Sequence, residues 1–369
     1  MDATFSPLVY RIAFASMQGM GVDLARKLLD VVGSEEKFFA MSEKDLRGLT
    51  RGRSKIYRDD YRRDCLQRAV KEEGFTRDHG IAATYFTDAS YPHRLLEASD
   101  APALIYTLGQ CDLESAHVIS VVGTRHATQY GIRFCDMLIG ELAKRLPDLV
   151  VVSGLAYGID IAAHRAALKH GVPTVAVLPR GLNRIYPAMH RADAVAIAKQ
   201  GGMLLTDYTS QDTVQKGNFL ARNRIVAALS DCTVIVESAG SGGALVTASL
   251  AMSYNRDVMA VPGRYGDEFS VGCNKLIATN KAALITGADD LMAAMRWEPA
   301  RPVQELDLFP SLTKEEQPVV DVIRDHGEIH INALADALQL PVYKLMSILV
   351  ELDCKNVIMT LPGCRYALA

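Results

Sequence analysis

Six short apolar runs, separated by segments with helical periodicity, constrain the fold of this chain more than any other feature. They cover residues 118–122, 149–152, 174–178, 203–205, 233–236 and 258–261. Continuous apolar runs of this length are typical of strands buried on both faces, and their alternation with helices is typical of a parallel sheet. We therefore predict an α/β domain over residues 79–298, with a doubly wound, mainly parallel sheet.

The first 78 residues have a different, helical pattern. Ser6-Pro7 opens a predicted helix that runs to about Met17, Gly19-Met20-Gly21 interrupts it, and a second helix covers 22–32. A helix–Gly-x-Gly–helix unit resembles a helix–hairpin–helix of the SAM-like kind, whose turn N–H groups can contact a nucleic-acid phosphate. A plain helical hairpin is the alternative. A basic run over 47–63, with two interleaved tyrosines, fits either a nucleic-acid-facing patch or a solvated helix face.

The last 71 residues read as a linker and a small module. Residues 299–311 contain three prolines and no periodicity, which indicates a linker, and 312–369 contain three helical segments followed by a β-hairpin. That order is the pattern of a winged helix. The module has five Lys and Arg against eight Asp and Glu, and this excess of acids repels phosphate. We therefore expect it to contact protein or to be structural.

Small residues follow three of the predicted strands, at the point where a helix would begin. The segments are Gly123-Thr124-Arg125, Ser153-Gly154 and Gly240-Ser241-Gly242-Gly243. Glycine lets the backbone approach a ligand, a helix N-terminus offers unpaired N–H groups, and an arginine matches a phosphate. Ligands bind in the crevice at the carboxyl ends of such strands. The pattern predicts an anion-binding crevice there, although tight turns with a surface arginine would look the same.

A second group of candidate residues lies on one predicted helix. Lys216, Phe219, Arg222 and Asn223 fall about one turn apart, and Arg224 follows them. A ring that stacks on a base, worth ~1–3 kcal/mol, and cations that hold phosphates would suit single-stranded nucleic acid. The alternative is that Phe219 fills the core and Arg222 pairs with a carboxylate. For Arg222 and Asn223 both interpretations stay open.

Enzymatic signatures are sparse in this sequence. Asp160 and His164, four residues apart, could form an acid–base dyad or a local hydrogen bond that braces a helix. Neither a phosphate-binding P-loop nor a GxGxxG pattern occurs, and the histidines do not cluster with cysteines or acids at metal-ligand spacing. We therefore expect no metal, no cofactor and no hydride-transfer or nucleotide-hydrolysing activity of these classes.

Composition favours a cytoplasmic protein. The net charge is −3, so a nucleic-acid site would have to be a local patch. No apolar run approaches the roughly 20 residues of a membrane span, and the N-terminus lacks a signal-peptide pattern. Seven cysteines, an odd number without CxxC pairs, fit buried free thiols in a reducing compartment.

Together these motifs resemble the DprA/Smf family, the bacterial DNA-processing proteins of natural transformation. The matching segments are VVGTRHATQYG (121–131), SGLAYGIDIAAH (153–164), the YP of GLNRIYPAMH (181–190), FLARNRIVAALS (219–230), VIVESAGSGGALVTASLA (234–251) and VPGRYGDEFSVGCNKLI (261–277). One departure is Pro179, where the family often has glycine, and proline removes an N–H donor there.

The resemblance implies an extended Rossmann-like domain that binds single-stranded DNA, with the helical and winged-helix flanks described above. It also implies a homodimer that protects incoming DNA and helps to load the RecA recombinase. The site residues that it carries over are the three glycine-containing turns, Lys216, Phe219 and Arg222-Asn223-Arg224.

The rival function is a nucleotide-binding enzyme. The same kind of domain occurs in cytokinin-activating phosphoribohydrolases, which use a PGGxGTxxE stretch with a catalytic glutamate. Here Glu237 precedes the glycines and no further acid follows until Asp257, so that carboxylate is missing. A pure protein scaffold is a third possibility, which leaves the phosphate-type turns unexplained.

Overall fold

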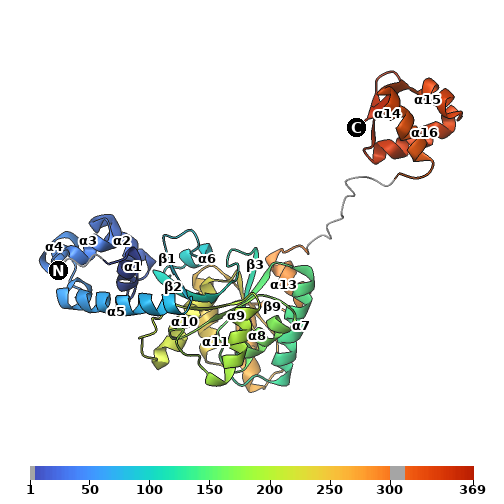
Figure 1. Cartoon of the computed structure of the whole chain (residues 1–369). Coiled ribbons are helices and arrows are strands. Elements are labelled where there is room, and N and C mark those ends of the chain that lie inside the picture. Colours follow the sequence, from blue (N-terminus) through green and yellow to red (C-terminus); the bar gives the residue numbers. More distant parts are fainter. Residues whose placement is uncertain (1–4, 300–311) are drawn as a thin grey trace. The chain divides into compact units, whose positions relative to one another are not determined.

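The computed structural model describes residues 5–299 and 312–369, which divide into two compact units, one within 1–300 and one within 301–369 (Figure 1). Apart from Pro299, the predicted linker lies outside the described residues.

The N-terminal region is helical, as predicted. Its elements are α1 (Pro7–Ala15), α2 (Val22–Val32), α3 (Glu35–Ala40), α4 (Glu43–Thr50), the 3₁₀ turn η1 (Lys55–Tyr57) and α5 (Asp59–Asp78). Ser6 caps α1 by accepting a hydrogen bond from the Val9 N–H, and α2 has the predicted bounds. The first helix ends two residues before the predicted position.

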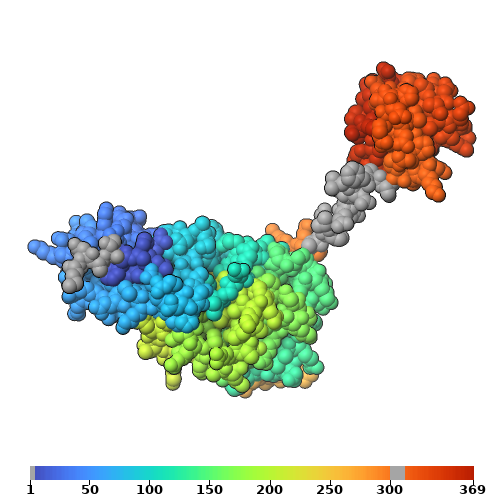
Figure 2. All heavy atoms as spheres, in the orientation of Figure 1, coloured from blue at the N-terminus to red at the C-terminus, as the bar shows by residue number. Residues whose placement is uncertain are grey.

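The Gly-x-Gly turn between α1 and α2 joins this region to the sheet. Gly21 forms a β-bridge with Pro102, and the Val22 N–H donates to the Ala101 carbonyl at 2.9 Å. On α5, the buried Glu72 carboxylate accepts hydrogen bonds from Ser210, at 2.8 Å from its N–H and 2.5 Å from its hydroxyl. Residues 5–78 therefore belong to the same compact unit as the sheet, and in Figure 2 their blue atoms lie directly against the cyan and yellow-green atoms of the rest of this unit.

A nine-stranded sheet forms the centre of this unit, in the order β1-β2-β6-β5-β4-β3-β7-β8-β9. All its strand pairs are parallel except β1–β2 and β2–β6. The strands are β1 (Ala82–Tyr85), β2 (Leu104–Gly109), β3 (His117–Val122), β4 (Leu149–Ser153), β5 (Thr174–Val177), β6 (Met203–Thr206), β7 (Cys232–Ile235), β8 (Asp257–Ala260) and β9 (Ala283–Leu284). The six predicted runs coincide with β3 to β8, so the mainly parallel sheet is confirmed.

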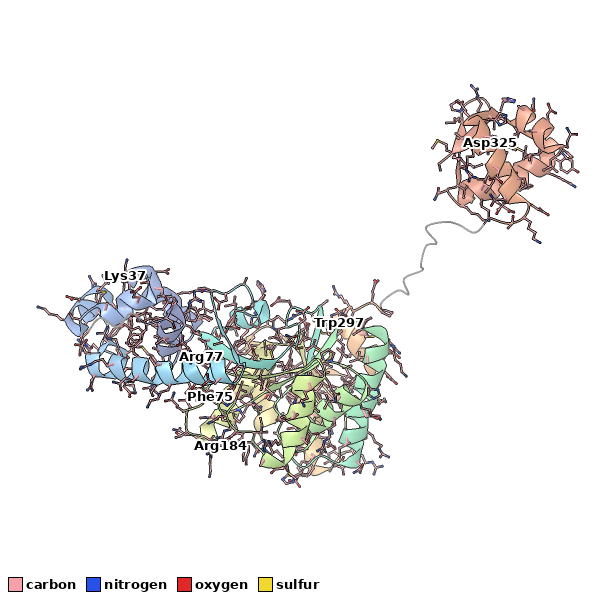
Figure 3. All side chains as sticks on the ribbon, viewed as in Figure 1. Lys37, Phe75, Arg77, Arg184, Trp297 and Asp325 are labelled. Atoms are coloured by element: carbon pink, nitrogen blue, oxygen red, sulfur yellow. The ribbon has the colours of Figure 1, made fainter. Side chains whose placement is uncertain are left out.

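Helices cover both faces of the sheet. Alternate residues of each strand point to opposite faces, so each strand contributes side chains to two hydrophobic cores. On β3, Ile119 and Val121 belong to one core, whereas Val118 and Val122 belong to another. The helices are α6 (His93–Leu96), α7 (Gln129–Arg145), α8 (Ile159–Lys169), α9 (Arg191–Lys199), α10 (Lys216–Ala228), α11 (Gly243–Ser253), α12 (Val271–Ala278) and α13 (Ala288–Met295), with 3₁₀ turns η2 (Ala188–His190) and η3 (Glu268–Ser270). Trp297 follows α13 and is labelled in Figure 3. Its ring meets that of His117 edge-on, with 4.7 Å between ring centroids. The predicted doubly wound arrangement is thus observed.

The C-terminal unit contains the predicted three helices and hairpin. Its elements are α14 (Glu316–His326), β10 (Glu328–His330), α15 (Ile331–Leu338), α16 (Val342–Cys354), β11 (Ile358–Leu361) and β12 (Arg365–Leu368). The short strand β10, which we did not predict, pairs with β12 in the antiparallel order β10-β12-β11. The winged-helix assignment itself stays a prediction.

No single helix in the described part of the chain is both long and apolar enough to cross a membrane. The pair α15 and α16 reaches that length and hydropathy together, but it is bent by 108°.

Candidate functional site

The site lies where the strand order of the sheet reverses. After β3 the chain adds β4, β5 and β6 on one side, and then β7, β8 and β9 on the other. The helices that follow β3 and β7 therefore diverge, and a crevice opens at the carboxyl ends of these two strands. A cavity of about 570 Å³ occupies this position. We call it the crevice.

Most of the predicted site residues line the crevice. They are Gly123, Thr124, Arg125, Lys216, Phe219, Arg222, Asn223, Ser241, Gly242 and Gly243. Four others, Ser153, Gly154, Arg224 and Gly240, are absent from its lining. Segments separated by about a hundred residues in the sequence thus meet at one place.

The turn after β3 is held by backbone hydrogen bonds to both neighbouring segments. The Thr124 N–H donates to the Glu237 carbonyl at 2.7 Å, and the Thr124 carbonyl accepts from the Ile159 N–H at 3.1 Å. A Cβ atom on Gly123 would lie 2.5 Å from Ile159 Cγ1 and 2.9 Å from the Glu237 carbonyl oxygen, so only glycine fits. This packing fixes the backbone from which the exposed Arg125 projects.

An aromatic pair and two cations form one wall of the crevice. Phe219 is half-buried, and the exposed ring of Tyr186 meets it edge-on with 5.3 Å between centroids. The Arg125 guanidinium carbon lies 5.6 Å from the centre of the Phe219 ring, and Lys216 is exposed one turn earlier on α10. Neither cation has an ion pair with a described residue. Sequence reasoning gave Tyr186 no role in the site, although an aromatic residue in the YP motif was a usable signal.

Arg222 is buried behind this wall. The residue is 3% exposed, and its Nη1 donates to the Gly154 carbonyl at 2.5 Å and to the Val177 carbonyl. A Cβ atom on Gly154 would lie 2.4 Å from Nη1, so the missing side chain makes room for the guanidinium. Backbone carbonyls therefore take the place of the carboxylate that we considered, and Arg222 ties α10 to the ends of β4 and β5.

Arg224 faces away from the crevice. Two residues along a helix is a rotation of about 200°, so Arg222 and Arg224 cannot share a face. Arg224 pairs with Asp207 at 2.5 Å and lines a different cavity of about 710 Å³. Four aspartates line that cavity, namely Asp23, Asp100, Asp207 and Asp212. This surface is thus acidic.

Ser153 and Gly240 also lie beside the crevice and not in its lining. Ser153 is fully buried, and its hydroxyl donates to the Val121 carbonyl at 2.6 Å, which joins β4 to β3. Gly240 is exposed in the loop before α11, next to the lining residues Ala239 and Ser241.

Glu237, which could have supplied catalysis, is engaged in holding a helix. Glu237 is buried, and its carboxylate accepts hydrogen bonds from the Thr128 N–H at 2.9 Å and the Thr128 hydroxyl at 2.5 Å. Thr128 in turn caps α7 by accepting from the N–H groups of Tyr130 and Gly131. The carboxylate thus anchors the start of α7 to the end of β7.

Asp160 and His164 do not act as a pair. His164 is fully buried, and its Nδ1 lies 2.8 Å from the Thr174 hydroxyl, which joins α8 to β5. Asp160 lines the crevice, where burial raises the pKa of its carboxyl group and the nearby Arg222 charge opposes that shift. Both sequence interpretations of this pair, a dyad and a mutual hydrogen bond, give way to separate partners.

His164 makes the stability of the fold sensitive to acid. Burial, followed by the Arg222 charge, lowers the pKa of the imidazole to about 3 from 6.5. The folded state thus binds fewer protons between these pH values, so the stabilisation present above pH 6.5 is lost as the pH falls towards 3. We expect His164→Gln to make the free energy of unfolding less pH-dependent by about 1.4 kcal/mol per pH unit in this window. Urea unfolding at pH 7, 5 and 4 measures the free energy of unfolding of the wild type and the variant. The same dependence of this free energy on pH in both proteins would contradict the prediction.

The crevice has the chemistry of an anion and aromatic-ligand site. Its two unpaired cations suit phosphates, and the Phe219 ring suits a planar base. No cluster of three or more His, Cys, Asp or Glu residues in the described part of the chain could hold a metal ion.

Comparison with known proteins identifies the family. The family model described as "DNA recombination-mediator protein A" matches residues 82–296. The chain belongs to the DprA/Smf family. It is 32% identical to the protein Smf of Escherichia coli K12 over 279 residues, which are 74% of each chain. It is 38% identical to the DNA processing protein DprA of Streptococcus pneumoniae R6 over 206 residues, which are 56% of this chain and 71% of the relative.

Two solved structures of DprA proteins resemble this fold. DprA from Streptococcus pneumoniae has a TM-score of 0.65 and 28% identity, with 79% of this chain and 98% of that chain covered. DprA from Helicobacter pylori has a TM-score of 0.52 and 31% identity, with 58% and 95% covered, and its structure was described for its mode of binding single-stranded DNA. The Rossmann-like DprA fold predicted from the motifs is therefore confirmed.

Proposed function

We propose that the crevice binds single-stranded DNA. The observation that carries this proposal is the wall made by Phe219, Arg125 and Lys216. It places a partly exposed ring beside the unpaired Arg125, with the unpaired Lys216 one turn earlier on the same helix. Cations that follow the backbone and an aromatic ring that stacks on bases are the parts used by single-strand binding sites. The Helicobacter pylori relative, which binds single-stranded DNA, supports the same ligand for this family.

A single strand fits the crevice better than a duplex. The ring of Phe219 is half-buried in a concave wall beside Tyr186. Only a base that has left its own stack can reach such a ring, and duplex bases are already stacked and paired. We therefore expect binding to prefer single strands strongly.

Within the cell, the proposal extends to recombination. We propose that the protein protects incoming DNA and helps to load the RecA recombinase during natural transformation, as a cytoplasmic homodimer without a cofactor or catalytic residue. Seven free cysteines fit a reducing compartment. RecA filament assembly on DNA coated by a single-strand binding protein tests the loading step, and light scattering tests the dimer.

The alternative proposal, a nucleotide-cleaving enzyme, has less support. The crevice could accept a nucleotide, but Glu237 is buried and hydrogen-bonded to Thr128. Fluorescence anisotropy with a labelled single strand, run beside a nucleotide-hydrolysis assay, separates the two proposals. Hydrolysis without binding of the single strand would favour the enzyme.

Phe219→Leu tests the stacking contact. Leucine keeps most of the side-chain volume and removes the aromatic face, so affinity for a single strand should fall by about 1–3 kcal/mol. Because the ring is half-buried at the surface of α10, the melting temperature should stay close to wild type. Anisotropy titration and thermal unfolding measure the two effects. A large fall in melting temperature with unchanged affinity would show instead that Phe219 serves the core.

A further inference from the structure

A groove between α7 and α8 begins where the crevice ends. It has a volume of about 510 Å³, and α7 and α8 lie side by side along its length (Figure 1). Arg125 lines both the crevice and this groove, so the two are continuous at that residue. A strand that leaves the crevice past Arg125 can therefore continue into the groove.

The groove has an apolar floor and a basic rim. Ala127, Ile132, Ile161, Ala162 and Ala166 form the floor, and Tyr157, 41% exposed, stands at the end near Arg125. Arg125, Arg133, Arg165 and Lys169 supply the rim, with Asp136 as the one carboxylate among its lining residues. Bases can lie on apolar and aromatic surface while phosphates meet the rim, which is the division that a single strand requires.

Ion pairs leave part of this rim free. Arg165 forms a two-pronged pair with Asp193 at 2.9 and 3.0 Å, and Lys169 pairs with Asp136 at 2.7 Å. Arg133 has no ion pair with a described residue, and its Nε donates to the Gln129 carbonyl at 3.2 Å. Asp136 already pairs with Lys169 and lies 2.9 Å from His170 Nε2, so its carboxylate presents little net repulsion to a phosphate. Arg133 is therefore the strongest free anion contact beyond Arg125.

Charge distinguishes this groove from a neighbouring cavity of about 790 Å³, with which it shares Arg133. That cavity also contains Arg264, but three carboxylates line it, namely Glu237, Asp267 and Glu268. The acidic cavity that contains Arg224 is still less suited to a polyanion. Among these neighbouring surfaces, the groove is the one where cations outnumber carboxylates.

We propose that single-stranded DNA leaves the crevice past Arg125 and continues along the groove, with phosphates on Arg133 and a base against Tyr157. This inference rests on the proposed function of the crevice and adds a second subsite with its own residues. A short strand would occupy the crevice alone, and a longer strand would occupy both.

The test compares two strand lengths, oligothymidylates of about 6 and about 20 nucleotides, in titrations across a range of salt concentrations. For the wild-type chain, the longer strand should show the steeper dependence of log Kd on log salt. Arg133→Ala should make the slope for the longer strand shallower by about 0.7 and leave the short strand unchanged. Tyr157→Ala should weaken binding of the longer strand at least fivefold with the same lack of effect on the short one.

Lys144→Ala is the matched control. Lys144 is exposed on the same helix, about 16 Å further along its axis, and is absent from the groove lining. It should bind both strands like the wild type. A wild-type chain that binds neither strand would overturn the proposed function as well as this inference. Binding of the short strand, with equal slopes for both lengths and no effect of Arg133→Ala, would overturn the groove alone.

Photo-crosslinking gives an independent readout of the path. A longer strand with a 4-thiothymidine at one end should crosslink to peptides within 126–137 or 157–169. Crosslinks confined to 262–270 would show that the strand leaves across the other cavity, and this would overturn the proposal. If Arg133→Ala impaired only the binding of a protein partner, the groove would be a peptide site and the proposal would likewise fail.

Discussion

Replacing Arg125 and Lys216 together by alanine is expected to weaken binding of a short single strand about a hundredfold at low salt. Each cation is unpaired among the described residues and lines the crevice, so each loss removes one phosphate contact. A charged hydrogen bond near the surface contributes about 1.4 kcal/mol, which is about tenfold in Kd. The slope of log Kd against log salt should become shallower by about 1.4 in the double variant, about 0.7 for each contact.

The control for this double variant removes two lysines at the opposite edge of the sheet. Lys144 and Lys199 are exposed in the last turns of α7 and α9, and these helices run back from the carboxyl ends of the strands to their amino ends. Lys144→Ala with Lys199→Ala makes the same change in net charge and should leave the salt slope unchanged. A fall in affinity equal to that of the crevice variant would mean that total charge, and not a local site, controls binding.

Unchanged affinity in the crevice variant would place the DNA site elsewhere. The basic run over 47–63 is the first alternative, and the structure engages part of its charge. Arg47 pairs with Glu43 at 2.8 Å and Arg58 with Asp60 at 2.6 Å. Arg62 is buried and donates to the Met41 carbonyl at 2.7 Å. These contacts engage three of the seven basic residues of the run, and Arg51, Arg53 and Lys55 have no ion pair with a described residue. A nucleic-acid-facing patch and a solvated helix face therefore both stay open for this run.

The sequence was most informative where burial is continuous. The runs that became β3 to β8 are apolar at nearly every position because both faces of the sheet are covered, so they could be located without knowledge of the fold. The two-residue β9 and three-residue β10 are too short to show any periodicity. The role of the Gly-x-Gly turn could not be predicted from the sequence, because its N–H groups could bind a phosphate or pair with another segment of the chain. In the structure this turn pairs with Ala101 and Pro102.

The candidate site shows the same limit for charged residues. Helical spacing placed Lys216, Phe219, Arg222 and Asn223 on one face of α10, and all of them line the crevice. Helical spacing could not predict how deeply each side chain is buried, however. The burial of Arg222 depends on carbonyls at the ends of two strands that are distant in the sequence. Grouping Arg224 with them followed the motif, although its rotation about the helix already pointed to the other side.

Arg222→Met is expected to destabilise the fold by about 3–5 kcal/mol without removing an exposed DNA contact. Methionine keeps much of the volume and deletes the guanidinium that donates to the Gly154 and Val177 carbonyls. Two buried carbonyls then lose the guanidinium donor, and the buried Asp160 loses the charge that most opposes the rise in its pKa. Removing one partner of a buried polar network in this way is strongly destabilising. Urea unfolding should show a lower midpoint with an unchanged m-value.

Arg125→Met is the matched substitution, because it makes the same chemical change at an exposed position of the same crevice. Its unfolding free energy should stay within about 0.5 kcal/mol of wild type, while its affinity for a single strand falls. Arg222→Lys keeps the charge but loses the forked donor, so its stability should lie between that of the wild type and that of Arg222→Met. This variant replaces Arg222→Met in the test if the methionine variant does not fold. The two methionine substitutions thus have opposite expected effects, because Arg222→Met lowers stability and Arg125→Met lowers affinity. Wild-type stability in Arg222→Met, with a loss of affinity as large as that of Arg125→Met, would show that Arg222 contacts DNA and that its burial does not decide its role.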